Sequence, residues 1–306
     1  MPVLEFRQVD VFTETPLRGN ALAVVLDADE LEGETMQAVA AETNLSETAF
    51  VMRPTVLPRP TGPQADYKIR IFTPTMELPI AGHPSVGTAF TLLSEGRFGA
   101  VGDGLTVHQE TGIGVLPIAI RPTESGPLIT MTQGEPQLFG RFDDLDRLAA
   151  SLGCSVSGIA PSGHGPRVAS TGLRQLMVPL SDLATLSSLK PDLSALAAIE
   201  RQAEVTGISA FVQESPSVAK VRFFSPISGI VEDPATGSAA GALGAYLASE
   251  SLLNVRDGQA NFTATQGIEI GRPSRIEVTV DVASGNPTRV QVGGHSVTVL
   301  RGRLSI

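Results

Sequence analysis

Two stretches of the chain, residues 84–94 and 234–249, contain no charged residue. Each opens with a proline, which directly follows His83 in one stretch and Asp233 in the other. Proline is favoured in the first turn of a helix, and a helix that is apolar on every side belongs in a protein interior. Both stretches are too short to be convincing membrane spans. We therefore expect a chain that folds around two buried helices.

The two stretches belong to an internal repeat. The segment HPSVGTA (83–89) aligns without gaps with DPATGSA (233–239), and this alignment pairs His83 with Asp233. Upstream, RIFTP (70–74) matches RFFSP (222–226) with a two-residue change in spacing. Each copy is predicted to form a strand, a loop and a helix.

The repeat predicts an α+β fold of two pseudo-symmetric domains, each a sheet wrapped around a central buried helix. We expect an N-terminal half-barrel domain over residues 1–120, joined by the C-terminal strand 291–306, and a C-terminal half-barrel domain over residues 121–290.

Periodicity predicts the remaining elements. Strands are expected at 3–12, 48–52, 67–73, 105–109, 113–120, 128–132, 218–224, 260–264, 275–282 and 288–303, and helices at 34–45, 143–152, 182–189 and 193–205. Proline- and glycine-rich stretches at 54–64 and 157–166 are expected to be loops.

Composition excludes several classes of protein. A formal net charge of −10 without any run of basic residues argues against a nucleic-acid-binding surface. Cys154 is the only cysteine, so an intramolecular disulfide and a multi-cysteine zinc site are both excluded. The first residues alternate like a strand and lack the layout of a signal peptide. We expect a soluble, cytoplasmic protein with no membrane partner and no metal.

The starts of the two buried helices are candidate binding positions. Free N–H groups and the positive end of the helix dipole favour an anion there. The competing interpretation is that Asp233 only caps its helix, which is a common role for aspartate. His83 at the aligned position favours a functional role, because histidine is a poor cap but a useful proton carrier.

Glu47, in NLSETAF (44–50), is a third candidate. Its neighbours are small or apolar, and burial disfavours a charged carboxylate, which suits a general acid/base. Taken alone, Glu47 would more often be a solvated glutamate in a turn.

These segments resemble the signature blocks of the phenazine-biosynthesis PhzF-like family. The resemblance rests on NLSETAF, RIFTPTMELPIAGHPSVGTAF (70–90) and VRFFSPISGIVEDPATGSAAGAL (221–243), and it extends to FRQVDVFTETPLRGNALAVV (6–25) and TQGIEIGRPSRIEV (265–278). It implies a diaminopimelate epimerase-like fold of two pseudo-symmetric halves, which agrees with the repeat. One departure is Ala21, where the family more often has proline; no catalytic residue is affected.

The resemblance also implies roles for individual residues. Glu47 would be the acid/base that moves a proton on carbon, and His83 and Asp233 would hold the polar groups of the substrate and assist the transfer. Residues expected to bind the substrate, chiefly its carboxylate, are Ser46, Gly82, Thr236, Gly237 and Ser238. Related epimerases and racemases use a cysteine at each helix start, and Cys154 lies at neither, so a two-cysteine mechanism is excluded.

The function expected from the resemblance is isomerisation of a small carboxylate-bearing substrate without a cofactor. In the best-known family member the substrate is a dihydro-hydroxyanthranilate. Two alternatives stay open, namely an amino-acid racemase or epimerase without catalytic cysteines, and a non-catalytic small-molecule-binding protein of the same fold. Relatives of this kind are often homodimers.

Overall fold

The computed structural model describes residues 3–55, 63–159 and 163–306, and the chain divides into two compact units. The first unit contains residues 1–132 and 293–306, and the second contains residues 133–292. The second unit is therefore inserted in the sequence between the main body of the first unit and its last strand.

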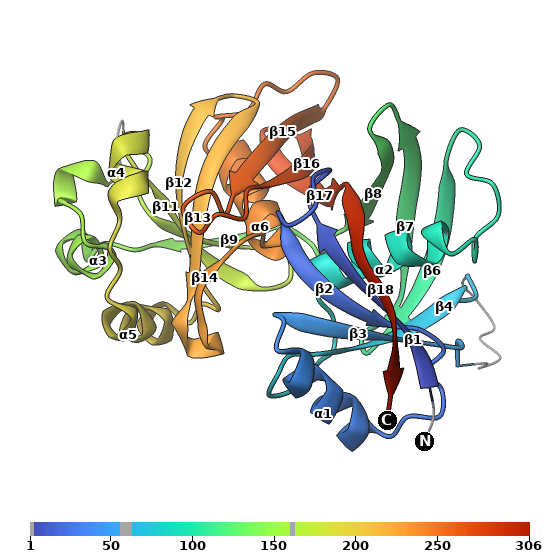
Figure 1. Ribbon diagram of the computed structural model, residues 1–306. Coiled ribbons are helices and arrows are strands. Elements are labelled where there is room, and N and C mark those ends of the chain that lie inside the picture. Colours follow the sequence, from blue (N-terminus) through green and yellow to red (C-terminus); the bar gives the residue numbers. More distant parts are fainter. Residues whose placement is uncertain (1–2, 56–62, 160–162) are drawn as a thin grey trace. The chain divides into compact units, whose positions relative to one another are not determined.

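The first unit is a mixed sheet around one helix, α2 (Gly82–Ser94) (Figure 1). Its strands are β1 (Val3–Val11), β2 (Asn20–Val25), β3 (Glu47–Met52), β4 (Tyr67–Phe72), β5 (Glu77–Leu78), β6 (Leu105–Thr111), β7 (Gly114–Thr123), β8 (Gly126–Thr132) and β18 (Ser296–Ser305). The pairing β1–β2 is antiparallel, β2–β3 and β4–β6 are parallel, and β18 pairs antiparallel with β1. A further helix, α1 (Gly33–Thr43), packs against β3 and β4 through a smaller apolar core that includes Met36 and Phe50.

The second unit repeats this plan around α6 (Gly237–Ser249) (Figure 1). Its strands are β9 (Gln137–Arg141), β10 (Arg167–Ser170), β11 (Arg174–Pro179), β12 (Ile208–Ser215), β13 (Val218–Ser225), β14 (Ile230–Asp233), β15 (Gln259–Gln266), β16 (Ser274–Ala283) and most of β17 (Asn286–Gly294). Again one antiparallel pair, β10–β11, is followed by two parallel pairs, β11–β12 and β13–β15. Helices α3 (Leu145–Leu152), α4 (Leu183–Ser188) and α5 (Leu193–Ala203) contribute to an additional apolar core on this unit.

The two central helices confirm the expected fold class. Each is 13 residues long, and most of their side chains are buried. Because a helix without charged residues has no face suited to water, it is stable here only because a sheet surrounds it. The fold is thus two sheet-and-helix units of one design.

The structural repeat does not follow the alignment expected from the sequence. The two central helices begin at Gly82 and Gly237 and are both followed by a glutamate, Glu95 or Glu250, as the C-cap. These bounds pair His83 with Ser238, and they pair Asp233 with Leu78. The expected pairing of His83 with Asp233 is therefore wrong by five residues. Short strings of proline, glycine and alanine matched there by composition alone.

A duplicated ion pair supports the structural alignment. In the first unit Arg70 on β4 donates twice to Glu77, with both N···O distances at 2.7 Å. In the second unit Arg222 on β13 donates twice to Glu232, at 3.0 and 2.7 Å. Bidentate arginine–carboxylate pairs have demanding geometry, so their recurrence shows that β5 and β14 are equivalent elements.

Several local expectations need correction. Strands β2, β5, β9, β10, β11, β12 and β14 were not expected, and the expected strand over 288–303 is divided at His295 into β17 and β18. The second central helix was expected from residue 234 but begins at Gly237, because Asp233 ends a strand and the next three residues form a turn. Parts of the expected loops, residues 56–62 and 160–162, lie outside the described residues.

Candidate active site

Two of the expected site residues meet at the start of α2. His83 is the second residue of this helix, where it is 6% exposed, and Glu47 is the first residue of β3. The closest atoms, His83 Nε2 and Glu47 Oε2, are 3.2 Å apart. The Glu47 side chain is only 15% exposed, so it is not a solvated glutamate in a turn.

The environment of His83 keeps its ring neutral. Complete burial lowers the pKa of His83 to about 3, because a charged imidazolium loses its hydration there. The neighbouring carboxylate would favour the cation, but desolvation is the larger effect at a fully buried ring. At neutral pH His83 is therefore a hydrogen-bonding group rather than a charge.

An asparagine that was not predicted completes this cluster. Asn20, the first residue of β2, is 2% exposed, and its Nδ2 lies 3.4 Å from His83 Nδ1. The hydroxyl of Ser46 donates to Asn20 Oδ1 at 3.4 Å. Ser46, expected to bind substrate, therefore contacts the cluster through Asn20. Asn20 stands in the block 6–25, but its role depends on burial beside His83, which sequence pattern alone does not reveal.

In the second unit, Asp233 belongs to a tightly bonded turn before α6. The N-cap of α6 is Thr236, so Asp233 lies three residues before the capping position. The Thr236 hydroxyl donates to Asp233 Oδ2. Gln266, which is 1% exposed, donates to the Asp233 carbonyl at 2.7 Å and to Thr236 Oγ1 at 3.0 Å. Because Thr236 Oγ1 accepts from Gln266, its own proton is directed to Asp233.

A second segment, residues 266–274, supports the same turn. Ser274 Oγ donates to the Pro234 carbonyl at 2.7 Å. Gly267 has φ +77°, and a Cβ there would come within 2.6 Å of the Pro234 oxygen. Only glycine accommodates both the backbone angle and this approach. The block TQGIEIGRPS therefore holds the turn that carries Asp233, and Gln266 is a second residue that the sequence did not single out.

The polar groups of the candidate site differ between the two units at equivalent positions. On the parallel strand pair, Glu47 lies opposite Leu22 in the first unit, and Ile208 lies opposite Leu176 in the second. At the helix start His83 is replaced by Ser238, and before the helix Leu78 is replaced by Asp233. The scaffold is duplicated, but Glu47, His83 and Asp233 have no ionisable counterpart at the equivalent position of the other unit.

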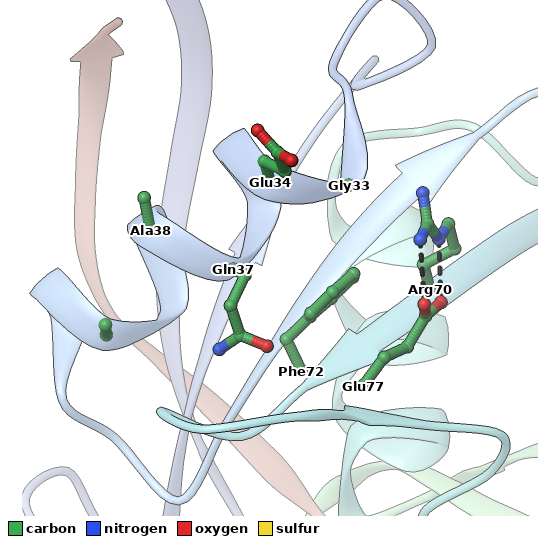
Figure 2. A pocket seen from close by; sticks show the side chains of 8 residues that line it. Gly33, Glu34, Gln37, Ala38, Arg70, Phe72 and Glu77 are labelled. Atoms are coloured by element: carbon green, nitrogen blue, oxygen red, sulfur yellow. Dashed lines mark hydrogen bonds and ion pairs between the residues drawn. The ribbon is translucent and has the colours of Figure 1, made fainter.

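One hollow on the first unit is lined by none of these groups. It has a volume of about 550 Å³ and is lined by one side of α1 together with Arg70, Phe72 and Glu77 (Figure 2). In the second unit the equivalent Arg222 is covered by α4, whose Leu186 and Leu189 carbonyls accept from its Nη1. Among the described residues of the first unit, no helix corresponds to α4, and the hollow lies at the position that α4 covers in the second unit.

Other residues singled out by the sequence take no part in this arrangement. Cys154 is packed at the edge of the apolar core of α3 to α5, and burial raises the pKa of its thiol. Across the described ranges, no group of three or more His, Cys, Asp or Glu side chains is placed to hold a metal ion. Nor does any helix in those ranges have the length and apolarity needed to cross a membrane.

Comparison with known proteins agrees with the fold. A family model described as "Phenazine biosynthesis-like protein" matches residues 9–302. Trans-2,3-dihydro-3-hydroxyanthranilate isomerase from Pseudomonas aeruginosa is 37% identical over 296 residues, which cover 96% of this chain and 97% of the relative. An uncharacterized isomerase, YddE of Escherichia coli O157:H7, is 34% identical over 302 residues, which cover 97% of each chain.

Solved structures give the same result. The crystal structure of a PhzF-family phenazine biosynthesis protein from Bacillus anthracis superposes with a TM-score of 0.88 at 30% identity, over 100% of both chains. A hydroxyproline epimerase from Agrobacterium vitis shares the fold alone, with a TM-score of 0.62 at 13% identity over 99% of this chain and 92% of that one.

These features define an isomerase of the diaminopimelate epimerase-like fold, as expected. Within that class, the chain belongs to the phenazine biosynthesis-like (PhzF) family.

Proposed function

We propose that the protein isomerises a small carboxylate-bearing substrate by moving a proton from one carbon to another, with Glu47 as the general acid/base. The observation that carries this proposal is the approach of Glu47 to the buried, neutral His83 at a helix start. Glu47 takes a proton from the substrate carbon, the electron pair shifts along the conjugated system, and Glu47 returns the proton at the new position. No atom is gained or lost, and the steps require no cofactor.

His83 and the helix start supply the complementary electrostatics. A neutral imidazole N–H and free backbone N–H groups are donors that can stabilise negative charge as the proton leaves carbon. Gly82, Gly237 and Ser238 are each assigned to carboxylate binding at their own helix starts, and Ser46 and Thr236 are assigned to substrate binding. Asp233 holds a polar group of the substrate. A dihydro-hydroxyanthranilate is the first substrate to test, because relatives with this activity are 37% identical.

The difference between the units supports an isomerase over a racemase. A two-base racemase needs a base on each face of one carbon, and the position equivalent to Glu47 in the second unit is Ile208. A racemase reading would require Asp233 to serve as the second base. Chiral analysis of the product separates the two reactions.

The test is proton exchange with Glu47→Gln, a change that preserves size but removes the base. We expect exchange of the substrate C–H in deuterated water to fall by about 10²–10⁴-fold, while binding measured by thermal shift persists. Glu42→Gln, on the exposed side of α1, is the matched control and should exchange like the parent. Parental exchange in Glu47→Gln would refute the assignment. Binding without exchange in the parent would support a non-catalytic binding protein.

A further inference from the structure

The two ring nitrogens of His83 face chemically different neighbours. Nδ1 lies 3.4 Å from the amide nitrogen of Asn20, and Nε2 lies 3.2 Å from a carboxylate oxygen of Glu47. An amide NH₂ group can only donate, whereas a carboxylate only accepts. The two neighbours therefore place opposite demands on the two sides of the ring.

In the structure the Asn20 amide directs its NH₂ group at His83 Nδ1. The Ser46 hydroxyl, which can donate or accept, donates to Asn20 Oδ1 at 3.4 Å and is compatible with this orientation. The opposite orientation would place an amide oxygen against Nδ1 and require the ring proton there. In that case Nε2 would present a lone pair to Glu47, and two acceptors would face each other in a buried site whenever Glu47 is ionised. The arrangement that suits an ionised Glu47 has the NH₂ group toward Nδ1 and the ring proton on Nε2, where the 3.2 Å approach to Glu47 Oε2 does not itself have hydrogen-bond geometry.

We propose that Asn20 is a positioning residue that holds His83 in the tautomer with its proton on Nε2. The neutral ring carries a single proton, and Asn20 occupies the lone pair of Nδ1. His83 then presents a donor, not a base, on the side of Glu47. Given the proposed function, this leaves Glu47 as the base of the pair and makes His83 the group that stabilises developing negative charge.

The second unit supports the link between Asn20 and His83. There the helix-start position holds Ser238, which has no tautomers. The strand position equivalent to Asn20 is Arg174, which is exposed and forms an ion pair with Glu204 at 3.0 Å. The equivalent strand of the second unit therefore forms without a buried asparagine at this position. The buried asparagine occurs in the unit whose central helix begins with a histidine-containing turn.

The test is direct observation of the ring nitrogens by NMR. Long-range ¹H–¹⁵N correlation spectra of uniformly ¹⁵N-labelled protein at neutral pH distinguish the two neutral tautomers and the cation. The chain has only four histidines, so His83→Gln identifies the His83 signals by their loss. We expect the Nε2–H pattern in the parent. The Nδ1–H pattern in the parent would overturn the proposal without any mutant.

Asn20→Asp inverts the demand on Nδ1, since a carboxylate can only accept. We expect loss of the Nε2–H pattern and appearance of the Nδ1–H or cationic pattern, together with a fall in kcat that exceeds any change in KM. Asn286→Asp, at an exposed position of β17, is the matched control and should leave the spectrum unchanged. If Asn20→Asp does not fold, Asn20→Leu should give a mixture of tautomers. An unchanged Nε2–H pattern in either folded variant would contradict the proposal.

The outcome is separable from that of the proposed function. The spectra require neither substrate nor turnover, so an Nε2–H ring together with parental exchange in Glu47→Gln would retain the tautomer and reject the base. An Nδ1–H ring in the parent, together with loss of exchange in Glu47→Gln, would reject the tautomer and retain Glu47 as the base.

Discussion

Replacement of Gly87 by alanine tests whether α2 is held against its sheet as closely as the structure indicates. A Cβ at residue 87 would lie 2.6 Å from Val11 Cγ2, 2.7 Å from Leu22 Cδ2 and 3.3 Å from Val9 Cγ2. These side chains belong to β1 and β2 and are completely buried. They have no free volume into which to retreat, so either the helix or the strands must move.

Two opposing effects set the magnitude. Alanine is the better helix former, by about 0.5–1 kcal/mol in a helix interior. An extra methyl group in a closely packed core typically costs about 1–3 kcal/mol, and contacts this short place Gly87→Ala within that range. The net expectation is a loss of about 1 kcal/mol in the free energy of unfolding. For a chain of 306 residues, with an unfolding entropy of about 2.1 cal/mol/K per residue, that corresponds to a decrease of roughly 1.5 °C in Tm.

The same displacement should reach the candidate active site. His83 lies one turn before Gly87 on α2, and its Asn20 contact, to β2, is already long at 3.4 Å. Moving the helix away from β2 lengthens that contact, so activity should fall by more than the unfolded fraction explains. The second unit has Ala242 at the equivalent helix position and tolerates it. The expected cost therefore comes from the neighbours of Gly87 and not from the helix.

Urea unfolding with an unchanged m-value measures the effect, and a double-mutant cycle with Leu22→Ala isolates its cause. Because Leu22 Cδ2 is one of the two closest atoms, Gly87→Ala should cost at least roughly 0.5 kcal/mol less when Leu22 is already alanine. A Gly87→Ala protein as stable as the parent, or a cycle without coupling, would show that the helix is not so closely packed.

Three further predictions concern the site and the lone thiol. The pKa of His83 falls from 6.5 to about 3 on folding, so between these pH values the unfolded chain binds more protons than the folded protein, and the free energy of unfolding should decrease as pH drops from 6.5 toward 3. Denaturant titrations of His83→Gln should show a flatter dependence of the free energy of unfolding on pH. The same dependence in the variant and the parent would contradict a neutral buried ring. Asp233→Asn should raise KM and lower kcat, and should reduce the free energy of unfolding by only about 1 kcal/mol. A variant with the same KM and kcat as the parent would show that Asp233 does not act on the substrate. Cys154→Ser should retain full turnover, and the folded parent should resist inactivation by iodoacetamide, because a thiol of raised pKa is a poor nucleophile; inactivation of the parent but not of the variant would show a nearby functional region.

The sequence predicted the fold best where a stretch has a property with a single structural explanation, such as the absence of charged residues. The uncharged stretches 84–94 and 234–249 predicted interior helices, and buried helices occupy 82–94 and 237–249. Glu47 and His83 were candidates from their sequence context, the family resemblance implied their roles, and the structure brings them to 3.2 Å. Their catalytic roles stay predictions.

The sequence could not show which residues distant along the chain lie next to one another in the fold. Asn20 and Gln266 are polar residues that matter because they are buried beside His83 and Thr236, and no local pattern encodes that burial. The repeat was detected but misaligned, because small residues recur by composition, whereas the correct alignment depends on helix bounds and on the pairing of Arg70 and Arg222 with their glutamates.

The insertion of the second unit into the first has a consequence for how the protein is made. Strand β1 pairs with β2 on one side, but its other partner, β18, ends at Ser305. Ribosomes add roughly 5–20 residues per second, so the edge of β1 waits on the order of 10–30 s after residue 132 until β18 is translated. During that interval the second unit can fold, while the first presents an open strand edge of the kind that invites mispairing between nascent chains. Slowing translation after residue 292 should therefore increase aggregation more than the same delay placed after residue 305.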